Sequence, residues 1–218
     1  MLVGLQVGQL LLVVAAGVLG WSMGLVSAWL TDGVLRLDGV SLRDSAHPLT
    51  REPLLQSGLA VTWMILVAVG GLSWQVGAAA LVAVPLLQVA VTDLRCGYVY
   101  TVAVGCGIAL CVALAAVVHV ASPWSGLVGA AVGMLSMALL RLFGRMGSRG
   151  VAMGRGDVSI ATMVGAAAGP GVLVALAVGL VLSGVLGLYV LLSRRSAVTS
   201  MPYGPGLCLG GLISLLLR

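Results

Sequence analysis

The sequence predicts an all-α membrane protein, a polytopic bundle of about eight transmembrane helices. Hydrophobic residues make up 61% of its 218 residues and charged residues only 8%, and the mean hydropathy is +1.19. A soluble domain carries about 25% charged residues, so this composition excludes a water-soluble globular protein. The apolar runs are continuous and much longer than the roughly 10-residue alternating strands of an outer-membrane barrel. The 32 glycines, many at a spacing of four as in Gly129 and Gly133, favour closely packed helices.

The first apolar segment, residues 3–31, is long enough to cross a bilayer with some tilt. It lacks a basic flank and a cleavage-site pattern, so we interpret it as a span and not as a secretory signal. Residues 32–53 hold most of the acidic residues, among them Asp32 and Glu52, and are expected to form a short water-exposed cytoplasmic loop. We interpret residues 1–218 as a single membrane domain.

Glycine and proline separate seven further spans, because both residues end helices for steric and hydrogen-bonding reasons. The expected spans are, approximately, 54–72, 75–92, 98–120, 124–143, 157–169, 171–192 and 205–217. Several of them are short against the roughly 20 residues that a straight crossing needs.

The arginines predict the orientation. The chain has no lysine and 11 arginines, and ten of these follow the first, third, fifth and seventh spans. Under the positive-inside rule these four loops are cytoplasmic and the N-terminus lies outside. Because the basic residues are strung along loops of a chain embedded in the lipid bilayer, they report orientation and do not predict a nucleic-acid partner.

Two acidic residues stand apart from the first loop. Asp93 ends the third span and Asp157 opens the sixth, and the expected topology puts both on the same side. Alone, Asp93 is explained by an interfacial pair with Arg95, and Asp157 by capping a helix. Together they favour one functional site, with Gly154 and Gly156 forming an active-site turn that only small residues allow.

Two carboxyl groups within hydrogen-bond reach share one proton, so one can activate water while the other protonates a carbonyl. This is the chemistry of aspartic proteases, which needs no metal and no other cofactor. We expect Asp157 to be the ionised member, because it lies at a helix N-terminus and Asp93 lies at a helix C-terminus.

The segments around these acids resemble the type IV prepilin peptidases, membrane aspartic proteases with a Gly-x-Gly-Asp motif. Residues 153–161 (MGRGDVSIA) are similar to the family's M-G-x-G-D-x-K-L-x block, and residues 92–95 (TDLR) to the block of its first aspartate. Residues 201–207 (MPYGPGL) are similar to its I-P-F-G-P-x-L block. The likeness covers about residues 85–217 well and the first span loosely.

The resemblance implies an endopeptidase that removes the short basic leader of prepilins, pseudopilins or competence pilins at the cytoplasmic face of the bacterial plasma membrane. It implies that Asp93 and Asp157 are the catalytic pair. The apolar helix of the substrate would enter from the bilayer, and candidates for its channel are Arg95, Pro202, Tyr203 and Gly204.

Two departures from the family pattern bear on these expectations. Ser159 stands where the family often has lysine, which removes a positive charge near the second aspartate. Residues 32–53 contain no cysteine, whereas many members carry two C-x-x-C pairs there together with an N-methylation activity. We therefore expect no zinc, and methyl transfer from S-adenosylmethionine remains only as an alternative.

Two other interpretations stay open at this point. A transporter or a pilus-assembly scaffold of the same fold would not cleave its partner, and a transporter would need a site at the bilayer midplane. A presenilin-like protease that cuts inside the bilayer fits the Gly-x-Gly-Asp tetrapeptide but not the flanking segments.

Overall fold

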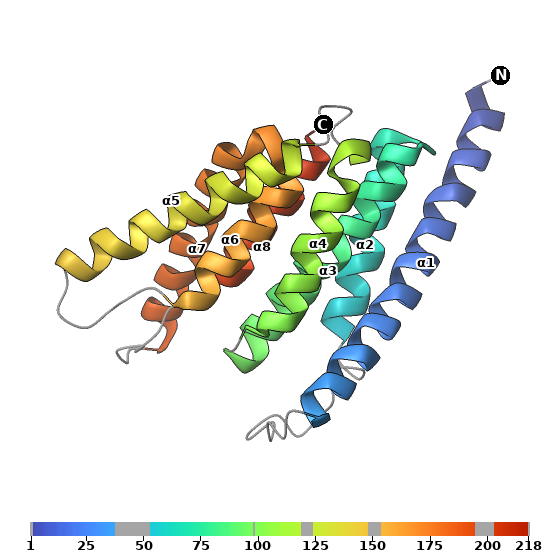
Figure 1. Ribbon diagram of the computed structural model, residues 1–218. Helices are drawn as coiled ribbons and strands as arrows, with labels where there is room; N and C mark the ends of the chain where they lie inside the picture. The colour runs from blue at the N-terminus through green and yellow to red at the C-terminus, as the bar shows by residue number, and fades with distance from the viewer. Residues whose placement is uncertain are drawn as a thin grey trace.

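The computed structural model describes residues 2–37, 53–97, 99–118, 124–147, 154–194 and 203–217, and every regular element in these ranges is helical (Figure 1). The α-helices are α1 (Leu2–Leu37), α2 (Pro53–Gly70), α3 (Trp74–Cys96), α4 (Thr101–Val118), α5 (Ser125–Gly147), α6 (Arg155–Ala168), α7 (Val172–Arg194) and α8 (Gly204–Leu216). A single 3-10 turn, η2 (Gly169–Gly171), joins α6 to α7. The predicted all-α fold is confirmed.

Length and composition make the chain a multi-pass membrane protein. Within the described residues, five stretches are long and apolar enough to cross a membrane, namely Val7–Gly33, Pro53–Gly70, Trp74–Leu94, Ser125–Met146 and Arg155–Tyr189. The last of these runs through α6, η2 and α7, and two shorter apolar helices accompany them, Thr101–Ala115 and Gly204–Leu216. Large apolar side chains such as Trp29 and Leu10 are exposed on the outside of α1, as lipid contact allows.

The helices alternate in direction as predicted. Helices α1, α3, α5 and α7 end, and α2, α4, α6 and α8 begin, at the lower end of the bundle in Figure 1. The end of the third helix and the start of the sixth therefore lie at one end of the molecule. Asp93 and Asp157 come from these two helix ends.

The first helix is longer than expected. It continues to Leu37, so residues 32–37 are helical and not part of a loop, and Asp32 is buried with 6% of its surface exposed. The prediction of a water-exposed Asp32 was therefore wrong. The rest of the predicted loop, residues 38–52, lies outside the described residues.

Polar contacts join the preceding turn of α1 to α3. Ser27 Oγ donates to Gln88 Oε1 at 2.7 Å, and the Gln88 side-chain amide donates to Thr31 Oγ1. Thr31 Oγ1 also donates to the Ser27 carbonyl one turn earlier, at 2.8 Å. Because α3 supplies these partners, Ser27 and Thr31 can be buried within the helix.

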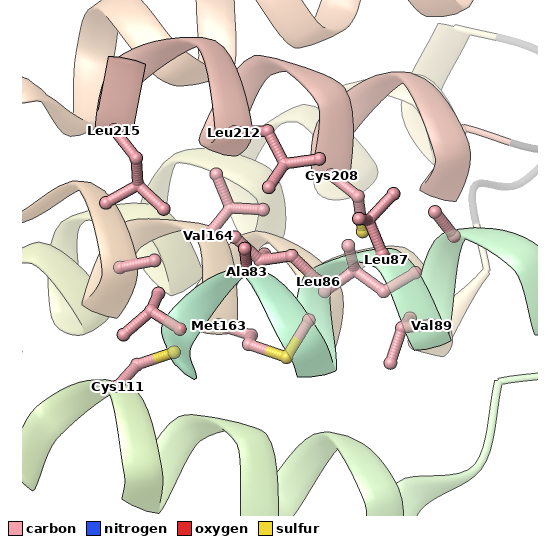
Figure 2. Close-up of a cluster of buried hydrophobic side chains, with 14 of the residues drawn as sticks. Ala83, Leu86, Leu87, Val89, Cys111, Met163, Val164, Cys208, Leu212 and Leu215 are labelled. Atoms are coloured by element: carbon pink, nitrogen blue, oxygen red, sulfur yellow. The ribbon is translucent and has the colours of Figure 1, made fainter. Parts of the chain in front are cut away.

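Four helices meet in the apolar core around α6. Leu86 of α3, Cys111 of α4, Met163 and Val164 of α6, and Leu212 of α8 belong to this buried cluster (Figure 2). Eight residues of α6 are buried, although the helix has only 14. The short α6 is therefore an inner helix of the bundle.

Helix α5 packs on α6 through backbone-to-backbone contact. A Cβ atom on Gly129 would overlap the Gly165 carbonyl oxygen and lie 2.9 Å from the Gly169 Cα. A Cβ atom on Gly133 would overlap the Ala161 carbonyl oxygen. These glycines therefore set the distance between the two helices, as the small-residue spacing predicted.

We expect Gly129→Ala to lower the free energy of unfolding by about 1–3 kcal/mol, because the added methyl group must push the α5 backbone away from α6. The measurement is the unfolding midpoint of the purified protein in detergent. The matched control is Gly144→Ala on the same helix, where a Cβ atom meets open space. Equal midpoints for the two variants would contradict the close-packing assignment.

Candidate active site

Asp93 lies in the last turn of α3. The helix ends at Gly97, whose φ of 61° is the left-handed conformation that favours glycine, and the Gly97 N–H donates to the Asp93 carbonyl at 2.9 Å. The Asp93 side chain is buried, with 7% of its surface exposed. The structure thus places this acid at a helix C-terminus, as the sequence predicted.

Asp157 lies in the first turn of α6, which begins after Gly154. The Gly154 N–H donates to Asp157 Oδ2 at 3.0 Å. This is one half of a capping box, in which the third helical residue bonds back to the backbone of the capping residue. The Asp157 carboxylate therefore accepts a hydrogen bond from a backbone N–H group that has no partner within α6.

The two glycines of the predicted turn have different surroundings. Gly154 has a φ of −61°, and among the described residues only Gly71, Gly97 and Gly169 have positive φ, so the turn does not need glycine for its backbone conformation. Gly156 is instead tightly packed, since a Cβ atom there would lie 3.0 Å from both Cβ and Cγ2 of Val99. The active-site turn of Gly154 and Gly156 stays a prediction.

Two glycine contacts bring the acids together. The contact of Gly156 with Val99 sets the start of α6 against the chain just after α3. Gly204, the first residue of α8, touches both helices, because a Cβ atom there would overlap Asp93 Oδ2 and lie 2.8 Å from Ile160 Cδ1. Asp93 and the first turns of α6, which carry Asp157, therefore lie on either side of Gly204, and a charge on Asp93 would act on Asp157.

The start of α8 adds a feature that the sequence did not reveal. The backbone N–H of Gly204 faces the Asp93 carboxyl group. Within the described residues Asp93 Oδ2 is buried and has no hydrogen-bond partner. The positive end of the α8 dipole therefore faces Asp93. The sequence predicted only that Asp93 lies at the negative end of its own helix, α3.

The predicted channel residues fall partly outside the described chain. Tyr203 is half-buried at the start of α8, and its carbonyl accepts a hydrogen bond of 2.9 Å from Ser183 Oγ of α7. Gly204 follows and touches Asp93. Pro202 and the side chain of Arg95 lie outside the described residues.

From the sequence, Arg141 is expected only as one of the positive charges of the fifth loop. The structure places it inside α5, with its Nε atom buried and the guanidinium acting on Asp157 as an opposite charge. A signal was present in the sequence, because Arg141 continues the spacing of four that starts at Gly129 and Gly133.

Residues 80–192 match the model of the type IV leader peptidase family, which is slightly more than half of the chain. The chain belongs to this family. Family membership makes it an aspartic endopeptidase of the prepilin peptidase type. No curated protein and no solved structure matches it.

The region that matches the leader peptidase family begins in α3 and ends in α7. It contains Asp93, Arg141 and Asp157 but not α8. The contact between Gly204 and Asp93 therefore comes from the structure and is independent of the family match.

We expect Gly204→Ala to lower kcat for prepilin cleavage by about 10²-fold, because the methyl group displaces the Asp93 carboxyl group from its place beside α8. Cleavage of a purified type IV prepilin, followed by gel shift, measures the effect. Gly105→Ala on α4, where a Cβ atom meets open space, is the matched control. Wild-type activity of Gly204→Ala would show that this contact does not hold Asp93 in place.

Proposed function

We propose that the protein removes the basic leader of type IV prepilins, pseudopilins or competence pilins, with Asp93 and Asp157 as the catalytic pair. The observation that carries this proposal is the meeting of the two acids. They are 64 positions apart in the sequence (157 − 93), yet Gly204 lies against both Asp93 at the end of α3 and Ile160, one turn after Asp157 in α6.

The depth of the pair favours a peptidase over a transporter. Asp93 is in the last turn of α3 and Asp157 in the first turn of α6, so both lie at one end of the bundle and not near its middle. A proton-coupled transporter of this kind would hold its acids near the bilayer midplane. Water reaches the end of a helical bundle more readily than its centre, and hydrolysis needs water.

The site is proposed to face the cytoplasm of a bacterial cell. The helix ends around it carry or adjoin arginines of the sequence, among them Arg141, Arg155 and Arg194. The positive-inside rule puts this end at the cytoplasmic face of the plasma membrane and the N-terminus outside.

The surroundings of the two acids favour different charge states. Asp157 Oδ2 accepts from the Gly154 N–H at the start of α6, where a negative charge is stabilised. Asp93 Oδ2 is buried and has no hydrogen-bond partner in the described chain, so a charge on it would be offset only in part, by the Gly204 N–H that faces the carboxyl group. We therefore assign the shared proton to Asp93 and the negative charge to Asp157.

Hydrolysis then follows from these two states. Asp157 takes a proton from water, the water oxygen bonds to the scissile carbonyl carbon, and Asp93 gives its proton to the carbonyl oxygen. When the resulting intermediate collapses, the C–N bond breaks, the amide nitrogen takes the proton from Asp157, and a hydroxyl proton returns to Asp93. The products are a leader with a new carboxyl group and a pilin with a new amino terminus.

The substrate contacts are proposed from sequence. Arg95, Pro202, Tyr203 and Gly204 would line the path of the substrate helix, which would enter laterally from the bilayer. Methylation of the new amino terminus with S-adenosylmethionine remains an additional activity to be measured on the same product.

We expect Asp93→Asn and Asp157→Asn each to lower prepilin cleavage by about 10²–10⁴-fold, because each removes one proton-transfer group. N-terminal sequencing of a co-expressed prepilin measures the outcome. Asp44→Asn, an acid of the predicted first loop, serves as the control and should cleave normally.

Normal processing by both Asn variants would remove the pair from the mechanism. If the wild-type chain leaves every prepilin intact but is still needed for pilus assembly, the non-cleaving scaffold is the correct interpretation.

A further inference from the structure

Helix α5 directs one of its faces at α6 and the candidate site. The residues of this face recur at a spacing of four and are Gly129, Gly133, Met137 and Arg141. Gly133 contacts Ala161 of α6, and Asp157 lies one turn earlier on α6. Because the two helices run in opposite directions, the turns of α5 that follow Gly133 lie level with the turns of α6 that precede Ala161, among them the turn of Asp157.

The direction of a helical side chain extends this placement. Each Cα–Cβ bond tilts toward the N-terminus of its own helix, so the side chain of Arg141 leans back over the turn of Met137. Met137 has 1% of its surface exposed, so this turn of α5 is inside the bundle. The head of Arg141 therefore points to the level at which α6 begins.

The surroundings of the Arg141 side chain favour an electrostatic role. Its Nε atom is buried and has no hydrogen-bond partner in the part of the chain that the structure describes. Burying part of a guanidinium removes some of its hydration, and an opposite charge nearby can offset this loss. Asp157 can supply such a charge, because it lies one turn before the α6 residue that Gly133 contacts, and the charge of Arg141 acts on it.

Other arginines near the site lack this placement. Arg145, one turn further along α5, and Arg155, the first residue of α6, are both exposed. Ser159, two residues after Asp157, carries no charge. Of these three described arginines, only Arg141 is partly buried, and its charge acts on Asp157.

We propose that Arg141 is a positioning residue that keeps the single negative charge of the acid pair on Asp157. This inference rests on the proposed function, because it assigns a role at the same site. Arg141 does not touch the reacting atoms. It acts by stabilising the ionised base that takes the proton from water.

The test compares the purified full-length chain with three variants, Arg141→Met, Arg141→Lys and Arg145→Met, in cleavage of a type IV prepilin, with kcat and KM measured separately. We expect Arg141→Met to lower kcat roughly 10- to 30-fold, because an opposite charge is lost from a site of low dielectric constant. Its KM should stay within about twofold, since Arg141 acts on the acid pair and not on substrate binding. Arg141→Lys, which keeps the charge, should restore most of kcat, and Arg145→Met should match the wild type.

Three results would overturn the proposal. Equal losses in Arg141→Lys and Arg141→Met would show that shape matters and charge does not. An unchanged kcat in Arg141→Met would remove any electrostatic role, and a rise in KM alone would make Arg141 a substrate contact. Thermal midpoints are measured in parallel, and Arg141→Gln, which keeps a polar group, replaces Arg141→Met if the latter does not fold.

Asp157→Asn separates this inference from the proposed function. If Asp157→Asn cleaves normally, the proposed acid pair is wrong and Arg141 has nothing to position. If Asp157→Asn is inactive while Arg141→Met has a wild-type kcat, the acid pair stands and only the role of Arg141 fails.

Discussion

The close packing around α6 is the constraint on which the rest of the structure depends. This helix has only 14 residues, and its neighbours approach it at glycines: Gly129 and Gly133 of α5 contact its backbone, and Gly107 of α4 leaves room for the Met163 side chain. In a membrane, helix association gains little from the hydrophobic effect and depends on close van der Waals contact. Small residues on the surrounding helices therefore fix where α6 begins, and with it the position of Asp157.

The site is assembled from helix ends. Asp93 comes from the end of α3, Asp157 from the start of α6, and Gly204 from the start of α8. Backbone groups at helix ends have no partners within their own helix, so they can bond to a side chain without disturbing the fold. The Gly154 N–H donates in this way to the Asp157 carboxylate, and the Gly204 N–H faces the Asp93 carboxyl group. The N-terminal ends of α6 and α8, which carry positive partial charge, therefore lie beside Asp157 and Asp93.

The sequence predicted those parts of this arrangement that depend on local composition. Long apolar runs and their breaks gave the helices, and the scarcity of acids outside the first segment singled out Asp93 and Asp157. Contacts between distant segments could not be predicted in this way. Asp32 was expected in water because the charge around it resembles a loop, whereas the α1 polar end packs on Gln88, a residue of α3. The contact of Gly204 with Asp93 likewise joins α8 to α3, and no local pattern encodes it.

The charges proposed for the site also explain why it can exist at the rim of a bilayer. Two ionised carboxylates side by side would repel each other and lose hydration, which is costly near a hydrocarbon core. One proton on Asp93 leaves a single negative charge on Asp157, and Arg141 brings a single positive charge toward it from α5. The three groups then sum to zero charge, and a neutral cluster costs much less to bury than an isolated ion. The condition proposed for catalysis, one ionised and one protonated acid, is therefore also the condition under which the bundle can hold the pair.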